Sequence, residues 1–330
     1  MHSQEMIERN TAIELVRVTE AAALTSARYM GRGDKNLVDE NAVGAMRQVL
    51  GQVQMDGVVV IGEGEKDEAP MLYIGEAIGD GSSLKVDIAV DPVDGTTSVA
   101  RGLPGAISVI ALSERGSMHC PRQFVYMNKI VTGPEAEDSI DINAPVGENL
   151  KNIAKVKLKK VSELTVVVLD RPRHEQLLSD IRNAGARVKL ISDGDVAASI
   201  DAALPSRDVD VLMGIGGTPE GVLSAAAIRC IGGCIQAKPW PRDESEIKAA
   251  EASGTDINKV YKTEDLIDSD DVFFAATGVS TGELLRGVHY FSGGARTQSI
   301  AMRGRSGTIR WIDSYHNFDR LNKLYGIYTD

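Results

Sequence analysis

Two acidic clusters in the first third of the chain are spaced to bind metal ions. The segment 86–97 reads Val-Asp-Ile-Ala-Val-Asp-Pro-Val-Asp-Gly-Thr-Thr, and its Pro92 and Gly95 bend the chain so that Asp91 and Asp94 can converge. Carboxylate oxygens are the ligands that Mg²⁺ and Mn²⁺ prefer. The segment therefore predicts a divalent-cation site, although an ordinary strand-terminating turn uses the same residue types.

The second acidic cluster, 62–68, follows the apolar run 58–61. It places four acids in six positions, namely Glu63, Glu65, Asp67 and Glu68. A solvated acidic loop is the alternative explanation for this cluster alone. Because like charges at neighbouring strand ends are costly without compensating cations, we interpret the two clusters as parts of one metal site.

Side chains in the second half of the chain suit a phosphorylated ligand. Arg171 and Arg173 flank a proline that stiffens their backbone, and guanidinium groups match the geometry of phosphate. Asp195 precedes an apolar helical pattern, so a metal ligand or a helix N-cap are both open for the 193–195 acids. Glu220 lies in a first helical turn, where exposed amides favour any carboxylate.

Five motifs, spread along the chain, carry a resemblance to a known family. They are E-G-E-x-D-E-A-P-M-L-Y-I-G-E from residue 63, D-P-V-D-G-T-T from 91, D-R-P-R-H from 170, D-G-D-V-A-A-S from 193 and G-I-G-G-T-P-E-G from 214. Together they resemble class II fructose-1,6-bisphosphatases of the bacterial type. That class belongs to the superfamily of lithium-sensitive, metal-dependent sugar and inositol phosphatases. The match runs from Glu14 to about His316.

The resemblance implies a set of site residues. The implied metal ligands are Asp39, Glu63, Asp91, Asp94 and Glu220. The implied substrate contacts are Lys35, Asp94, Gly95, Thr96, Tyr126, Arg171, Pro172, Arg173, Asp193, Gly194, Asp195 and Gly217. Many members of the family carry Glu where this chain has Asp94, which shortens the reach of that ligand.

The expected reaction is metal-assisted hydrolysis of a phosphomonoester. Two or more Mg²⁺ or Mn²⁺ ions would bind the scissile phosphate and lower the pKa of a bound water, with Asp91 and Glu63 as catalytic metal ligands. Thr96 would orient or deprotonate that water, or else cap the following helix. The resemblance implies release of the 1-phosphate of fructose 1,6-bisphosphate, giving fructose 6-phosphate in gluconeogenesis.

Three alternatives to this function stay open. Sedoheptulose 1,7-bisphosphate is a further substrate of some relatives, and an inositol-phosphatase-like activity would use the same superfamily chemistry. A protein of another class, a non-catalytic sensor of sugar phosphate, would retain the pocket and lose turnover. Metal-dependent phosphate release separates the sensor from the enzymes.

Composition restricts the partners and the compartment. The chain has 330 residues, 43% of them hydrophobic, and a net charge of −11, which argues against nucleic acid as a partner. Its three cysteines are too few for a disulfide framework and indicate a reducing cytoplasm. The sequence has neither a membrane-spanning apolar stretch nor a signal peptide pattern. We expect a cytoplasmic protein that binds a small sugar bisphosphate, and the resemblance implies a homo-oligomer, either dimer or tetramer.

The pattern of apolar residues predicts an α+β domain over 1–160 and an α/β domain over 161–330. In the first, helical periodicity precedes strands at 58–61 and 106–112, and 114–117 indicates a hairpin turn. In the second, strands at 165–169, 187–191 and 209–213 alternate with helices at 174–184, 196–203 and 219–231. Such alternation predicts a parallel sheet with ligands at its carboxyl edge. The resemblance implies a layered sugar-phosphatase fold with the active site between the two domains.

Overall fold

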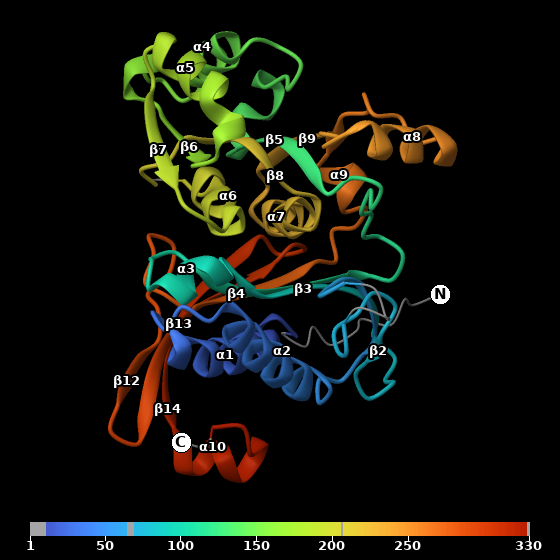
Figure 1. Cartoon of the computed structure of the whole chain (residues 1–330), viewed down its shortest axis with the longest axis vertical. Helices are drawn as coiled ribbons and strands as arrows, with labels where there is room; N and C mark the ends of the chain where they lie inside the picture. Colours follow the sequence, from blue (N-terminus) through green and yellow to red (C-terminus); the bar gives the residue numbers. More distant parts are fainter. Residues whose placement is uncertain (1–10, 65–68, 206, 329–330) are drawn as a thin grey trace.

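Helices and sheets alternate in five layers in the computed structural model, which describes residues 11–64, 69–205 and 207–328 (Figure 1). From one end to the other, the layers are α4 and α5, the six-stranded sheet, α6 and α7, the eight-stranded sheet, and α1 and α2. The mixed α/β content and the two multi-stranded sheets confirm the expected fold class.

The sheet between α1–α2 and α6–α7, here the first sheet, has eight strands in the order β12-β13-β11-β4-β3-β1-β2, with β14 on β13. Only β1 and β3 are parallel neighbours, and the other pairs are antiparallel. Its strands are β1 (Asp56–Ile61), β2 (Ala77–Ile78), β3 (Lys85–Asp94), β4 (Ile107–Glu114), β11 (Phe273–Gly278), β12 (His289–Phe291), β13 (Gly294–Arg303) and β14 (Thr308–Asn317).

The second sheet has six strands in the order β10-β9-β5-β8-β6-β7. They are β5 (Tyr126–Thr132), β6 (Thr165–Leu169), β7 (Arg187–Ile191), β8 (Val211–Gly217), β9 (Cys234–Pro239) and β10 (Tyr261–Lys262). The expected parallel arrangement is confirmed for β7, β6 and β8. It is wrong for the rest of this sheet, because β5 and β9 run antiparallel to their neighbours.

Helices cover both sheets and supply three apolar interfaces. The helices are α1 (Thr11–Ser26), α2 (Lys35–Leu50), α3 (Thr96–Arg101), α4 (Val146–Val156), α5 (Glu175–Asn183), α6 (Asp195–Ala203), α7 (Thr218–Ile231), α8 (Glu244–Ser253), α9 (Thr263–Leu266) and α10 (Phe318–Tyr325). Short 3₁₀ turns are η1 (Ala27–Tyr29), η2 (Pro134–Ser139), η3 (Val161–Glu163) and η4 (Pro172–His174). One buried core lies between α4–α5 and the second sheet, and another lies between the first sheet and α1–α2. The third surrounds α6 and α7 and touches both sheets.

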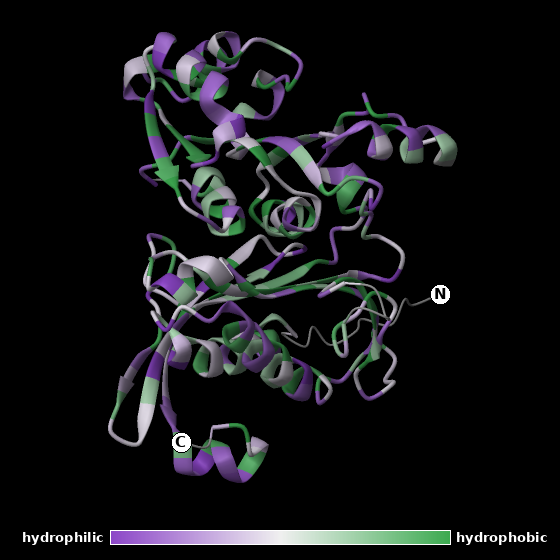
Figure 2. Ribbon diagram, viewed as in Figure 1, coloured by the Kyte–Doolittle hydropathy of each residue, from purple (hydrophilic) through white to green (hydrophobic). Residues whose placement is uncertain are grey.

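Helix α7 occupies the centre of the molecule because both of its sides are apolar or small. It contacts β3, β4 and β11 of the first sheet and β5, β8 and β9 of the second. Ser224 and the alanines 225–227 are fully buried and let the helix approach both sheets closely. Figure 2 shows hydrophobic residues concentrated along such inner elements and hydrophilic residues on the peripheral α10. No helix in the part of the chain that the structure describes has both the length and the hydropathy of a bilayer span.

Most of the expected elements form where the sequence placed them. The strands at 165–169 and 187–191 have the expected bounds, and the helix at 219–231 begins one residue earlier. The hairpin expected at 114–117 is wrong. The chain does turn there, with the Ser117 N–H donating to the Glu114 carbonyl at 3.0 Å, but the next strand, β5, belongs to the other sheet.

The two sheets do not divide the chain at residue 160. Strand β5 precedes that point yet pairs in the second sheet, and β11 to β14 follow it yet complete the first sheet. The division into two domains near residue 160 stays a prediction, but strands cross it in both directions. In sequence, β5 and β11 are ordinary apolar runs, and nothing local to them indicates which sheet each strand joins.

Candidate metal centre and phosphate site

The turn after β3 gathers the first acidic cluster. Between Asp91, opposite Val109, and Asp94, opposite Ile107, β3 has one residue more than β4, which is a β-bulge. Gly95 follows with a φ of +100°, a conformation that favours glycine, and precedes α3. The Asp91 carboxylate accepts a hydrogen bond from the Val93 N–H at 3.0 Å. The bulge and the glycine together shape the turn that carries both carboxylates.

Acidic side chains from several elements share the electrostatic field of this turn. Burial, followed by the charges of Asp94, Glu220 and Glu63, raises the pKa of Asp91 well above its ordinary value. Burial, followed by the charges of Asp195 and Glu220, raises the pKa of Asp94 in the same direction. The pKa of Glu220 is also raised, chiefly by burial. Glu220 belongs to α7, so the fold brings a residue from the far half of the sequence to the β3 turn.

Glu63 extends the acidic region toward α2. Burial, and then the charge of Asp39, raises the pKa of Glu63 to about 7. Asp39 is itself half-buried on α2, and its pKa is raised chiefly by burial. The remaining acids of the second cluster, residues 65, 67 and 68, lie outside the described residues.

The donor set fits a hard divalent cation. The Oε2 atom of Glu220 is buried and has no hydrogen-bond partner, so a strong acceptor is left for a cation to satisfy. Gly217 makes room for that carboxylate, because a Cβ there would lie 1.8 Å from Oε2. Within residues 11–64, 69–205 and 207–328, no three acidic, histidine or cysteine side chains already enclose a common point. The carboxylates are neighbours, and their role as a ligand set stays a prediction.

Replacing Gly217 by alanine tests the need for this space. Gly217 has a φ of −62°, which alanine adopts without strain, so the only conflict is with the Glu220 carboxylate. We expect Gly217→Ala to lower metal-dependent phosphate release about 100-fold, because catalysis is sensitive to displacements of about 1 Å. Gly44→Ala in α2, where a Cβ meets nothing within 4 Å, is the control and should leave the rate unchanged. A fully active Gly217→Ala enzyme would contradict the assignment of Glu220 to the site.

A cavity of about 350 Å³ adjoins these acids. It unites nine of the residues expected from the sequence, and its further lining residues are Val125, Leu169, Gly216 and Pro219. The nine are Asp94, Tyr126, Arg171, Arg173, Asp193, Gly194, Asp195, Gly217 and Glu220. They come from β3, β5, β8, the segments after β6 and β7, and the first turns of α6 and α7. The carboxyl ends of three parallel strands thus meet at the cavity, as expected for a sheet of this kind.

Two arginines give one wall of the cavity its positive charge. Arg171 donates to the Ser192 carbonyl at 2.6 Å and contacts the Asp193 carboxylate at 3.3 Å. The guanidinium carbon of Arg173 lies 4.8 Å from the centre of the Tyr126 ring. Both side chains are partly exposed and so can still bind an anion. Arginines and acids therefore line the same cavity, which suits a phosphate bound together with metal ions.

A buried lysine holds the acidic wall. The Lys129 side chain is fully buried, and its Nζ donates to Asp195 Oδ2 at 2.5 Å. The other oxygen of Asp195, Oδ1, is buried without a hydrogen-bond partner and remains free to accept one. Asp195 is the first residue of α6, and Gly194 takes the N-cap position. The alternative of Asp195 as the N-cap is therefore wrong.

Four of the expected substrate contacts lie outside the described lining of this cavity. Lys35 is exposed at the start of α2, and Pro172 is exposed in η4. Gly95 is buried in the β3–α3 turn. Thr96 donates from Oγ1 to the Val93 carbonyl at 2.9 Å, and Gly95 rather than Thr96 caps α3. Helix capping is therefore not the role of the Thr96 hydroxyl.

Sequence reasoning missed two buried residues of the site, Lys129 and His174. Lys129 had a detectable signal, because it alternates with Met127 and Val131 on a strand face that is otherwise apolar. A lysine on such a face requires a buried partner. His174 directly follows the arginine motif, but no local pattern tells whether it points inward.

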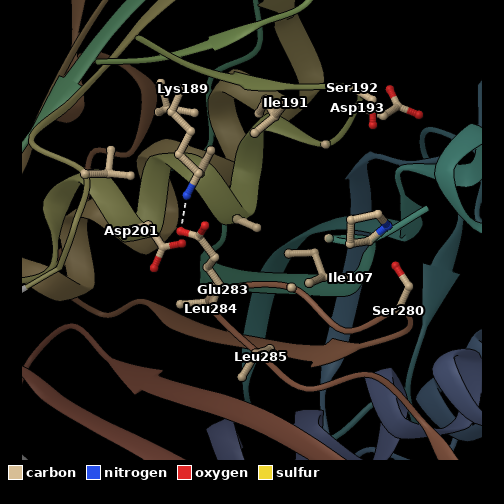
Figure 3. Close-up of a pocket in the computed structure, with 18 of the residues that line it drawn as sticks. Ile107, Lys189, Ile191, Ser192, Asp193, Asp201, Ser280, Glu283, Leu284 and Leu285 are labelled. Carbon is tan, nitrogen blue, oxygen red and sulfur yellow. Dashed lines mark hydrogen bonds and ion pairs between the residues drawn. The ribbon is translucent and has the colours of Figure 1, made fainter. Parts of the chain in front are cut away.

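A second cavity, of about 570 Å³, lies on the other side of the 192–194 loop (Figure 3). It is bounded by β7 of the second sheet, by α6 and by the 280–285 loop that follows β11. Lys189 and Glu283 form an ion pair across it, and Asp201 pairs with Arg207 at 3.3 Å. Asp193 and Gly194 line both cavities. The 192–194 loop thus separates the two cavities.

The layered α/β fold, with carboxylates and an arginine pair lining one cavity at its strand ends, is the arrangement expected of a metal-dependent sugar phosphatase. Comparison with known sequences gives the family. The chain matches the family described as bacterial fructose-1,6-bisphosphatase, glpX-encoded, over residues 9–316, and it belongs to that family. Members of the family are metal-dependent phosphoric monoester hydrolases.

Two similar curated proteins cover the chain almost end to end. Fructose-1,6-bisphosphatase class 2 of Haemophilus influenzae is 47% identical over 97% of this chain and all of its own length. D-fructose 1,6-bisphosphatase class 2/sedoheptulose 1,7-bisphosphatase of Synechococcus elongatus is 44% identical over 96% of this chain and 99% of its own. The family expected from the five motifs is confirmed.

Proposed function

We propose that this protein hydrolyses the 1-phosphate of fructose 1,6-bisphosphate to fructose 6-phosphate and phosphate, in gluconeogenesis in the cytoplasm. The observation that carries the proposal is the cavity that Arg171 and Arg173 line together with Asp94 and Glu220. An anionic sugar ester needs the arginines, and the crowded acids need cations. Family membership supplies the substrate.

The acidic residues would hold the metal ions. Glu63, Asp91, Asp94 and Glu220, with Asp39 beside Glu63, offer hard oxygen donors to Mg²⁺ or Mn²⁺. Such ions, when bound, neutralise the scissile phosphate and generate a nucleophilic water. The unpartnered Oε2 of Glu220 supports this role, since an acceptor buried without a donor is otherwise costly.

Other residues of the chain would bind and orient the substrate. Arg171, Arg173 and Tyr126 would hold the second phosphate, and the free Oδ1 of Asp195 would accept a sugar hydroxyl. The Thr96 hydroxyl donates its hydrogen bond to the Val93 carbonyl, so its oxygen lone pairs are available to accept a hydrogen bond from the attacking water. Thr96 would then orient the water rather than carry charge.

Phosphate release measured with three esters tests the proposed function. We expect metal-dependent release from fructose 1,6-bisphosphate with Mg²⁺ or Mn²⁺ and none with chelator. Sedoheptulose 1,7-bisphosphate is the second candidate substrate, because the Synechococcus relative is named for both sugars. Faster release from inositol 1-phosphate would contradict the substrate assignment and keep the mechanism. Absence of release from every ester, with the metal shown to bind, would favour the sensor.

A homo-oligomer, dimer or tetramer, is also proposed. The β12–β14 extension projects from the body of the protein (Figure 1) and exposes Phe291, Trp311 and Tyr315. Large apolar side chains at an unpaired sheet edge favour a second copy of the chain as their cover. The mass of the protein in solution, measured by light scattering, tests this assembly.

A further inference from the structure

His174 is a buried histidine that bonds to the backbone of two strands. It is 1% exposed, its Nδ1 lies 2.7 Å from the Leu169 carbonyl at the end of β6, and its Nε2 lies 2.7 Å from the Ile215 N–H of β8. A carbonyl can only accept and an amide can only donate. The imidazole is therefore neutral, with its proton on Nδ1 and its lone pair on Nε2.

The residue before it holds the other side of the same peptide. Arg173 donates from Nε and Nη2 to the Ile215 carbonyl at 3.2 and 2.9 Å. Both backbone groups of Ile215 are thus bound by consecutive side chains. These contacts of Arg173 and His174 are called the Ile215 clamp below.

The clamp stands where strand pairing ends. On one edge, β8 pairs with β5 along its whole length, including Ile215 with Asn128. On the other edge, β6 pairs only with Val211 and Leu212. Beyond them the backbone of β8 needs other partners, because unpaired buried amides and carbonyls are costly. The clamp supplies these partners at the point where β8 reaches the cavity.

A glycine permits this approach of the imidazole. Gly214 has a φ of +137°, and a Cβ there would lie 3.0 Å from His174 Nε2. Gly216 and Gly217, the next residues after Ile215, line the cavity. The position of Ile215 therefore fixes the backbone wall of the cavity, and the same contacts hold Arg173 against Tyr126.

We propose that His174 is a positioning residue for the sugar phosphate: it locks Ile215 of β8 to the end of β6 and so holds Arg173 and the 216–217 wall in their binding geometry. This inference rests on the proposed function of the same cavity. It assigns His174 no contact with the substrate or with the reacting atoms.

Acidification should open the clamp. A second ring proton would place an N–H of His174 against the N–H of Ile215. The charged groups facing the ring are Arg173 and Arg171 from its own turn and Asp195 from α6. Burial, and then the two arginines, lowers the pKa of His174 below its ordinary value, although the Leu169 hydrogen bond and Asp195 oppose this. Substrate affinity should therefore hold at neutral pH and fall only as pH drops through that lowered pKa, below about 6.5.

Two variants divide the clamp into its two bonds. In His174→Gln the side-chain oxygen can replace Nε2 and accept from Ile215, whereas in His174→Asn the side-chain amide can replace Nδ1 and donate to Leu169. We expect His174→Asn to raise KM for fructose 1,6-bisphosphate roughly tenfold with kcat within about twofold, since the loss is of ground-state positioning. His174→Gln should recover KM to within about twofold and lose the acid limb of kcat/KM. His316 is a partly buried histidine on β14 that is hydrogen-bonded to Thr297, and His316→Gln should change neither constant.

Equal KM values in the Gln and Asn variants, or a fall in kcat alone, would overturn the inference. A second measurement does not depend on activity. The ¹⁵N shifts of the His174 ring in the wild-type protein should show a protonated Nδ1 and an unprotonated Nε2, and the reverse tautomer would also overturn it. If the wild type released no phosphate from any ester, the proposed function would fail, and the ring shifts would still decide whether the clamp exists.

Discussion

Asp91→Asn should reduce metal-dependent phosphate release by about a thousandfold or more, because it removes the negative charge of a proposed metal ligand at nearly constant volume. The Asp91 carboxylate lies between the charges of Asp94, Glu220 and Glu63. An amide oxygen cannot supply the charge that holds the ions there. Phosphate release from fructose 1,6-bisphosphate at saturating Mg²⁺ measures the effect.

The same variant should be more stable than the wild type when metal is withheld. Burial and neighbouring carboxylates raise the pKa of Asp91 in the folded protein, so its ionisation disfavours folding above that pKa and the penalty disappears as pH falls. In chelator at neutral pH we expect Asp91→Asn to unfold at a higher temperature, by roughly 1–2 kcal/mol of stability. Added Mg²⁺ should raise the Tm of the wild type more than that of the variant.

Asp87→Asn, four residues earlier on β3, is the matched control. Asp87 accepts from the Gly116 and Met118 N–H groups at 2.8 and 3.2 Å and pairs with Arg115 at 3.6 Å. Its replacement should cost roughly 1–2 kcal/mol of stability and keep phosphate release metal-dependent. An active, metal-dependent Asp91→Asn enzyme would contradict the metal-site assignment, and an unchanged Tm in chelator would contradict the repulsion argument.

The site residues that could be predicted from the sequence are those whose role is indicated by the residue types next to them. The sequence around Asp91, Asp94 and Gly95 predicts a turn, and Arg171 and Arg173 indicate an anion site. The alternation of strands and helices after residue 160 gave the carboxyl edge where these motifs meet. Each of these inferences depends on neighbours within about ten residues.

Features that depend on distant contacts could not be predicted in this way. Whether β5 joins the first or the second sheet is decided by its fit against β8 and β9, more than 70 residues away. The orientation of His174 depends on the free edge of β8, which exists only because β6 is short there. The apolar strand face of Lys129 indicates a buried partner, but only the packing of α6 identifies that partner as Asp195.

The buried ion pair between Lys129 and Asp195 leads to the second large effect, which is on stability. Both side chains are at most 4% exposed, and Nζ lies 2.5 Å from Oδ2. Lys129→Met fills the space but leaves the Asp195 charge buried beside Asp94 and Glu220. Removing one partner of a buried pair typically costs about 3–5 kcal/mol, so we expect a loss of that size in denaturant unfolding. Lys248→Met, from an exposed pair with Glu244, should change stability by less than about 0.5 kcal/mol.

A double variant separates the lost attraction from the charge left behind. Lys129→Met combined with Asp195→Asn removes both charges, and it should recover most of the stability lost by Lys129→Met alone, because no isolated buried charge remains. Its phosphate release should stay low, since the Asp195 carboxylate is gone from the cavity wall. If the double variant were as unstable as Lys129→Met, the loss would come from packing around the lysine stem. The ion pair would then be a consequence of the α6 position, and the acids at the centre of the site would need no internal cation.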